Sequence, residues 1–89
     1  MLIPAYTKRF KRDLDLILKR GKDKEKIKAV AKRLIEETGL EDKHRVHKLS
    51  GEYIGRMECH IEPDWLLVYR VNGDEIIFER TGSHSDLFT

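Results

Sequence analysis

The sequence has few cysteines and no long apolar run. Its single cysteine, Cys59, excludes an internal disulfide and suits a reducing compartment. No apolar stretch approaches the roughly 18 residues of a membrane span, and nothing resembles a signal peptide. No linker, repeat or low-complexity segment divides the 89 residues. We therefore expect one domain over residues 1–89, with one modest core, in the cytoplasm.

Charged residues are abundant but unevenly distributed. They make up 38% of the chain, and the formal net charge is +2. Residues 1–35 hold twelve Lys or Arg against four Asp or Glu, whereas residues 36–89 hold six against twelve. A basic half of this density is typical of a protein that binds phosphates or many carboxylates. A solvated helical face would give the same pattern, so charge alone does not decide between them.

Two amphipathic helices are predicted in the first half of the chain. Thr7 is a suitable N-cap for a helix that ends near residue 21, and its exposed face is basic almost throughout. A second helix is predicted from about residue 23 to residue 38, with Gly39 as its stop. The segment that ends at Pro4 is predicted to be a short edge strand.

A β-hairpin is predicted in the last third of the chain. Asn72-Gly73 lies between two runs rich in Val, Ile, Leu and aromatic residues. Counting outward from that turn places Trp65 opposite Arg80. The central strand is apolar on both faces, so its second face is predicted to form a groove or to meet a partner. We therefore expect an α+β fold in which two N-terminal helices pack on a twisted antiparallel sheet of three to four strands.

Titratable side chains gather at the open end of this hairpin. His60 and His84 flank it, and His47 lies upstream on a loop that could fold over it. Histidine can take or give a proton near neutral pH, although a lone histidine is more often a surface or structural residue. Together with Asp64, and with Arg80 as a bidentate phosphate ligand, the histidines indicate acid–base chemistry.

A metal site is the alternative that several histidines raise. His44 and His47, with His60 or His84, could supply three ligands. The chain has no HExxH motif and no paired cysteines, however. We therefore expect neither a metal nor another cofactor.

Two segments, HIEPDWLLVY and FERTGSHSDLF, resemble the YafQ branch of the RelE/ParE toxins of bacterial toxin–antitoxin systems. The similarity extends over nearly the whole chain. It implies a microbial-RNase-like fold that enters the ribosomal decoding site and cuts mRNA within a codon, without a metal. In such a reaction the RNA 2′-hydroxyl attacks the adjacent phosphate, which leaves a cyclic phosphate and a free 5′-hydroxyl.

The resemblance also implies roles for individual residues. His60, assisted by Asp64, would be the general base and His84 the general acid. Arg80 would neutralise the phosphate, and His47 would contact phosphate or exchange roles with either histidine. The residues expected to contact RNA are Trp65, Phe88, Lys48 and Arg56. Trp65 is equally well interpreted as a core residue.

The chain departs from the family pattern at one position. Relatives usually carry a basic residue directly before the acidic position that is Glu58 here, whereas this chain has Met57 there and Arg56 one place earlier. A shift by one residue moves a side chain to the other face of a strand. Either a local bulge re-aims Arg56, or the chain lacks one phosphate contact.

The resemblance implies two macromolecular partners and no membrane. The 70S ribosome, carrying the mRNA, would be gripped through its RNA by a basic surface. The residues assigned to that surface are Lys8, Arg9, Lys11, Arg12, Lys19 and Arg20. The other partner would be a cognate antitoxin protein that covers the basic and concave surfaces. The alternatives are a non-catalytic RNA- or protein-binding module of the same fold, and a gyrase inhibitor of the ParE type, a branch that lacks the catalytic histidines.

Overall fold

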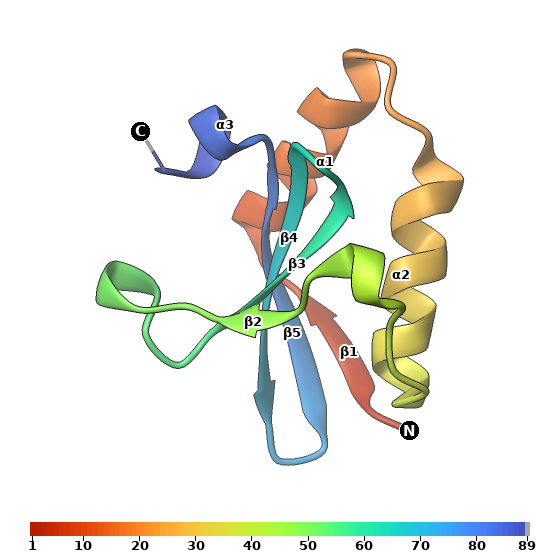
Figure 1. Cartoon of the computed structure of the whole chain (residues 1–89), viewed down its shortest axis with the longest axis vertical. Helices are drawn as coiled ribbons and strands as arrows, with labels where there is room; N and C mark the ends of the chain where they lie inside the picture. The colour runs from red at the N-terminus through yellow and green to blue at the C-terminus, as the bar shows by residue number, and fades with distance from the viewer. Residues whose placement is uncertain (89) are drawn as a thin grey trace.

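The computed structural model describes residues 1–88, apart from the side chain of residue 52, and is built on a five-stranded sheet (Figure 1). The strands lie in the order β1-β5-β4-β3-β2, with β1 parallel to β5 and all other neighbours antiparallel. Their bounds are β1 (Ile3–Tyr6), β2 (His47–Lys48), β3 (Met57–Glu62), β4 (Trp65–Asn72) and β5 (Glu75–Gly82). The α+β class is confirmed. The expected three to four antiparallel strands are wrong, because the polar stretch before residue 50 adds β2 and because β1 is parallel.

The helices begin and end at recognisable caps. They are α1 (Lys8–Lys19), α2 (Lys24–Glu36) and α3 (His84–Phe88), with 3-10 turns η1 (Asp42–His44) and η2 (Gly51–Tyr53). The predicted cap at Thr7 is confirmed, since its hydroxyl accepts a hydrogen bond from the amide of Phe10 at 2.9 Å. α2 ends before the predicted Gly39, because Glu37 already adopts the left-handed conformation. Within residues 1–88, no helix is long and apolar enough to cross a membrane.

Helices α1 and α2 bury their apolar stripes against one face of the sheet. Phe10 and Ile17 of α1 and Ile27 and Val30 of α2 belong to this core. The sheet side chains that they meet are Cys59, Ile61, Trp65, Leu67, Tyr69, Ile76 and Phe78. Alternate residues of β4 point to this face, as the period of a strand requires. Each fully buried side chain of this size contributes about 1.5–3 kcal/mol relative to an exposed one.

The hairpin of β4 and β5 is confirmed, but its predicted register is wrong. Asn72 pairs with Glu75, so the loop residues are 73 and 74. Gly73 is the first loop residue and has a positive φ, which is the conformation that favours glycine at this position of a two-residue turn. Asn72, the last strand residue, does not have a positive φ. A bulge at Glu79 then shifts the register by one more residue. As a result, Arg80 pairs with Val68 rather than with Trp65.

The second face of the sheet is covered by the carboxyl-terminal segment. Leu66 and Val68 are fully buried beneath Leu87 of α3, with Leu49 and Tyr53 packed at the margin. The prediction that this face of β4 stays open to a groove or partner is therefore wrong along its middle. Leu87 covers the Leu66–Val68 part of this face, and β2 lies at the edge of the sheet beyond β3.

Candidate active site

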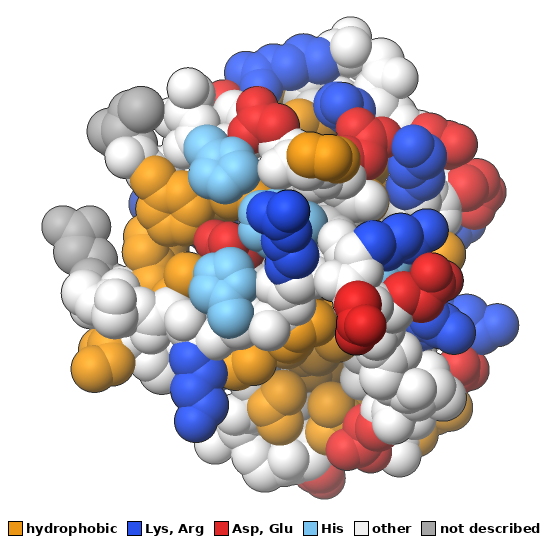
Figure 2. All heavy atoms as spheres, viewed as in Figure 1, with side chains coloured by type: hydrophobic (Ala, Val, Ile, Leu, Met, Phe, Trp, Pro, Cys, Tyr) orange, Lys and Arg blue, Asp and Glu red, His pale blue; other side chains and the backbone are white. Residues whose placement is uncertain are grey.

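Five polar side chains meet where β2, β3, the β3–β4 turn and α3 come together. We call them the histidine cluster: His47, Glu58, His60, Asp64 and His84. The ring centroids of His47 and His60 are 6.1 Å apart, and those of His60 and His84 are 5.7 Å apart. Figure 2 shows histidine side chains gathered on one face of the molecule, beside hydrophobic ones. The three histidines predicted to act together are thus neighbours.

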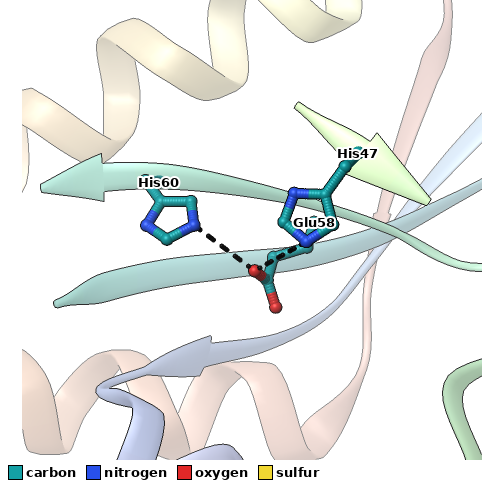
Figure 3. A group of neighbouring side chains, drawn as sticks. All are labelled: His47, Glu58 and His60. Atoms are coloured by element: carbon teal, nitrogen blue, oxygen red, sulfur yellow. Dashed lines mark ion pairs between the residues drawn. The ribbon is translucent and has the colours of Figure 1, made fainter. Parts of the chain in front are cut away.

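Glu58 is the buried centre of this cluster, and sequence reasoning missed it. Its side chain is about 5% exposed, and one carboxylate oxygen lies 3.2 Å from Nε2 of His47 and 3.4 Å from Nε2 of His60 (Figure 3). Strand geometry explains the arrangement, since β2 places His47 directly opposite Glu58 and His60 follows two residues later on the same face of β3. That spacing of two within a predicted strand was the available signal.

The remaining nitrogens of the two histidines also face oxygen atoms. Nδ1 of His47 lies 2.9 Å from the carbonyl of Arg45, and Nδ1 of His60 lies 3.3 Å from the carbonyl of Pro63. All four ring nitrogens therefore have an acceptor within 3.4 Å. A ring nitrogen that carries a proton can donate it to the oxygen beside it. The Glu58 carboxylate is the acceptor that the two rings share.

Asp64 fixes His84 rather than His60. One carboxylate oxygen of Asp64 accepts hydrogen bonds from the backbone amide of His84 at 2.9 Å and from its Nδ1 at 2.6 Å. These two bonds, the backbone one first, lower the pKa of Asp64. With Nδ1 carrying the proton toward Asp64, Nε2 of His84 is the nitrogen directed to chemistry. The prediction that Asp64 assists His60 is therefore wrong.

A second carboxylate anchors the short helix that carries His84. Asp86 accepts hydrogen bonds from the amide of Ser83 at 2.9 Å and from Nη1 of Arg20 at 2.7 Å. The Arg20 hydrogen bond is the larger cause that lowers the pKa of Asp86 to about 2. Arg20 was assigned to ribosomal RNA, but the structure gives it this intramolecular partner and a part in holding α3.

Arg80 is held by a residue that the sequence did not indicate. Asp13 of α1 accepts hydrogen bonds from Nε and Nη2 of Arg80 at 2.7 and 3.2 Å. The hydrogen bond to Asp13 raises the pKa of Arg80. Because the guanidinium is about nine-tenths buried and already paired, any phosphate must share it with Asp13.

The aromatic residue beside the cluster is Phe88, not Trp65. Trp65 is fully buried, and its indole N–H donates to the hydroxyl of Thr81 at 2.9 Å, so its prediction as a platform for RNA bases is wrong. Phe88 is 44% exposed and its ring centroid lies 6.5 Å from that of His84. Tyr53, another residue missed from the sequence, meets Phe88 edge-on at 5.5 Å.

The basic residues near the cluster differ in how far they are engaged. Nε of Arg56 donates to Glu79 at 2.7 Å, and Glu79 also accepts from Arg70. Met57 packs toward the core on the helix side. Arg56 directly precedes β3, and the pairings at Met57 and Glu58 show no bulge that would re-aim it. Seven of the basic residues predicted to bind RNA or the ribosome are exposed: Lys8, Arg9, Lys11, Arg12, Lys19, Arg20 and Lys48. Of these, Arg20 is already paired with Asp86.

Part of the histidine cluster also has the composition of a metal site. Ligand atoms of His47, Glu58 and His60 all lie within 4.8 Å of one another. Two imidazoles and a carboxylate suit Zn²⁺ or Cu²⁺, once the rings have lost the protons that face Glu58. His44, named as a ligand from the sequence, points elsewhere, because its Nδ1 lies 2.7 Å from the backbone carbonyl of His60.

The fold and the cluster define a class of protein before any comparison. A small α+β domain presents a carboxylate between two histidines, and a third histidine oriented by a second carboxylate. Such an arrangement is typical of acid–base chemistry. The chain belongs to the family described as bacterial toxin of type II toxin–antitoxin system, YafQ, which matches residues 2–89. The resemblance noted in the sequence is thereby confirmed.

Individual relatives agree with this assignment. The chain is 38% identical over 84 residues to the mRNA interferase toxin YafQ of Escherichia coli K12, covering 93% of this chain and 91% of that protein. It matches the toxin in a crystal structure of the E. coli DinJ–YafQ complex with a TM-score of 0.93 and 36% identity, over the full length of both chains. A metal-bound toxin from Helicobacter pylori matches with a TM-score of 0.92 and 37% identity, over 99% of this chain and 100% of that one.

Proposed function

We propose that this chain is the toxin of a type II toxin–antitoxin system and an endoribonuclease that cuts mRNA. The observation that carries the proposal is the Asp64–His84 pair beside the Glu58 carboxylate, because it sets a proton donor next to a proton acceptor. The E. coli relatives named mRNA interferase supply the substrate. A pure binding module would have no need for this arrangement.

His84 is the proposed general acid. Asp64 holds Nδ1–H and stabilises the imidazolium, which leaves Nε2–H free to protonate the departing 5′-oxygen as the P–O5′ bond breaks. The side chain of His84 is 55% exposed, so an RNA strand can reach it. The product on that side is a free 5′-hydroxyl.

Glu58 is the proposed proton acceptor, in place of His60. Its carboxylate takes the proton of the 2′-hydroxyl while that oxygen attacks phosphorus and closes the cyclic phosphate. His47 and His60, on either side of Glu58, stabilise the negative charge that develops on the phosphate oxygens by donating hydrogen bonds to them.

We propose further that the substrate is presented by the ribosome and that a protein antitoxin silences the activity. The exposed basic face of α1 fits ribosomal RNA, and replacing Lys8, Lys11 and Arg12 by Gln should weaken ribosome binding and flatten its salt dependence. The proposal of a protein antitoxin rests on family membership and on the crystal structures of E. coli DinJ–YafQ complexes.

The test is primer extension on a defined mRNA translated in vitro, with and without ribosomes, for wild type and His84→Ala. We expect cuts inside codons that require ribosomes and vanish in the variant. Cutting that survives in His84→Ala would move the acid to His47 or His60. Folded wild-type protein that never cuts would favour the binding module, and gyrase inhibition would favour the ParE-type alternative.

A further inference from the structure

A hollow lined by several arginines lies apart from the histidine cluster. It has a volume of about 260 Å³. We call it the arginine hollow; its lining residues are Thr7, Arg9, Tyr53, Arg56, Glu79 and Arg80. The residues come from the start of α1, from η2, from the entry to β3 and from the bulge of β5, so the hollow is built by parts of the chain that are distant in sequence.

The arginine hollow carries an excess of positive charge. Glu79 is shared by Arg56 and Arg70, and Asp13 neutralises Arg80. Arg9 is exposed and forms no ion pair within the described part of the chain. The lining therefore holds three guanidinium groups and one carboxylate, while Arg70 and Asp13 pair with lining residues from outside the hollow. A guanidinium is a planar fork that matches the oxygens of a phosphate, which makes a phosphate group the fitting ligand.

A line of contacts joins this hollow to the proton-transfer groups. The rings of His60 and His84 are 5.7 Å apart, those of His84 and Phe88 are 6.5 Å apart, and those of Phe88 and Tyr53 are 5.5 Å apart. Tyr53 lines the arginine hollow itself. The order is the histidine cluster, an aromatic pair and a cationic hollow. It suits an RNA strand whose scissile phosphate, next base and following phosphate meet these three in turn, since bases stack on aromatic rings and phosphates bind cationic groups.

We propose that the arginine hollow binds the phosphate on the 3′ side of the scissile one. The polarity of the bound strand rests on the proposed function. Glu58 takes the proton of the 2′-hydroxyl on the 5′ side of the cut, and His84 gives a proton to the 5′-oxygen of the next nucleotide. The leaving strand then continues past His84, over Phe88 and Tyr53. Arg9, assigned from the sequence to the ribosome, instead contacts the substrate strand.

The experiment uses an uncleavable trinucleotide with two phosphates, in which the nucleotide 5′ of the scissile phosphate is 2′-deoxy. A matched trinucleotide carries a neutral methylphosphonate at the second, 3′ phosphate. Binding to the isotope-labelled protein is followed by NMR titration. We expect wild type to bind the methylphosphonate about tenfold more weakly, the size of one exposed charge-assisted contact. Arg9→Gln should bind both trinucleotides with the same, weakened affinity.

The control variant is Lys11→Gln, which removes one positive charge from the same helix but does not line the hollow. It should keep the preference of wild type for the two-phosphate ligand. Wild type that binds both trinucleotides equally would overturn the inference, as would an Arg9→Gln variant that still discriminates.

A ribosome assay separates this inference from the proposed function. With the methylphosphonate placed 3′ to the cut in the mRNA, wild type should cut about tenfold more slowly, and Arg9→Gln should show no further loss. Undiminished cutting of the modified mRNA by wild type would overturn the hollow and leave the nuclease intact. No cutting of unmodified mRNA would overturn the proposed function and this inference with it.

Discussion

Replacing Glu58 by glutamine tests the buried carboxylate between the two histidines most directly. Glutamine keeps the size of the side chain and one acceptor oxygen, so the packing of β3 should persist. It removes the negative charge that faces Nε2 of His47 and His60 at 3.2 and 3.4 Å. It also removes the proposed acceptor of the 2′-hydroxyl proton.

The expected loss follows from the number of functions removed. A general base contributes about 10²–10⁴ in rate, or roughly 2.7–5.4 kcal/mol of activation free energy. Glu58→Gln also leaves two imidazoles without their shared carboxylate, so we expect a loss near the upper end of that range. His60→Gln removes one imidazole that would stabilise the phosphate and keeps the carboxylate. It should cost less, roughly 10–10² in rate.

The measurement is single-turnover cleavage of a defined mRNA on ribosomes, from about pH 5 to pH 9, with thermal unfolding of each variant as the control for folding. The rank order decides between the two assignments of the base. A His60→Gln variant that loses more activity than Glu58→Gln would refute the proposed acceptor and restore His60 to that role. A Glu58→Gln variant whose cleavage rate is within tenfold of wild type would also refute Glu58 as the acceptor.

Three further predictions concern stability and metal binding. The pKa of Asp86 is about 2 in the fold against an ordinary 3.8, so the unfolded chain takes up a proton at this residue before the folded chain does. The ion pair of Asp86 therefore stabilises the fold above about pH 4, and this stabilisation is lost as the pH falls to about 2. The free energy of urea unfolding should depend less on pH in Asp86→Asn than in wild type, and an equal pH dependence would contradict this. Gly82→Ala should lower Tm, at a cost of about 1–3 kcal/mol, since a Cβ there would lie 2.9 Å from that of Asp86; calorimetry that finds an equal Tm would disprove the clash. Added Zn²⁺ should inhibit cleavage by binding to His47, Glu58 and His60. EDTA should reverse the inhibition, which should be weaker at about pH 5 than at about pH 8 because protons compete with the ion for its ligands. Equal inhibition of the His47→Gln variant would place the ion elsewhere.

Local patterns predicted the parts of the fold that local physics determines. The cap at Thr7, the two amphipathic helices and the hairpin around Gly73 each depend on residues close in sequence, and each is confirmed. The pairing of β2 with β3 and of β1 with β5 depends on partners far along the chain, and it was missed or misjudged. The bulge at Glu79 has no sequence signature, yet it changes every pairing beyond it.

The same division holds for the candidate site. The sequence indicated the three histidines and Asp64, because their side-chain chemistry is distinctive whatever the fold. It did not indicate which carboxylate serves which ring, since Asp64 reaches His84 only through the position of α3. Glu58 looked like one of many charged residues; its spacing of two from His60 was the one signal in the sequence, and its burial between two histidines became apparent only in the fold.

The parallel pairing of β1 with β5 has a consequence for the time at which the protein becomes dangerous during its synthesis. Ile3 is made before the other strands of the sheet, but its partner Glu75 leaves the ribosome only after them. Contacts of such long range make folding late and slow. The proposed acid His84 follows β5 directly, so the nascent chain carries an incomplete site until β5 is in place. An antitoxin that binds the chain during this interval would bind it before the first cut.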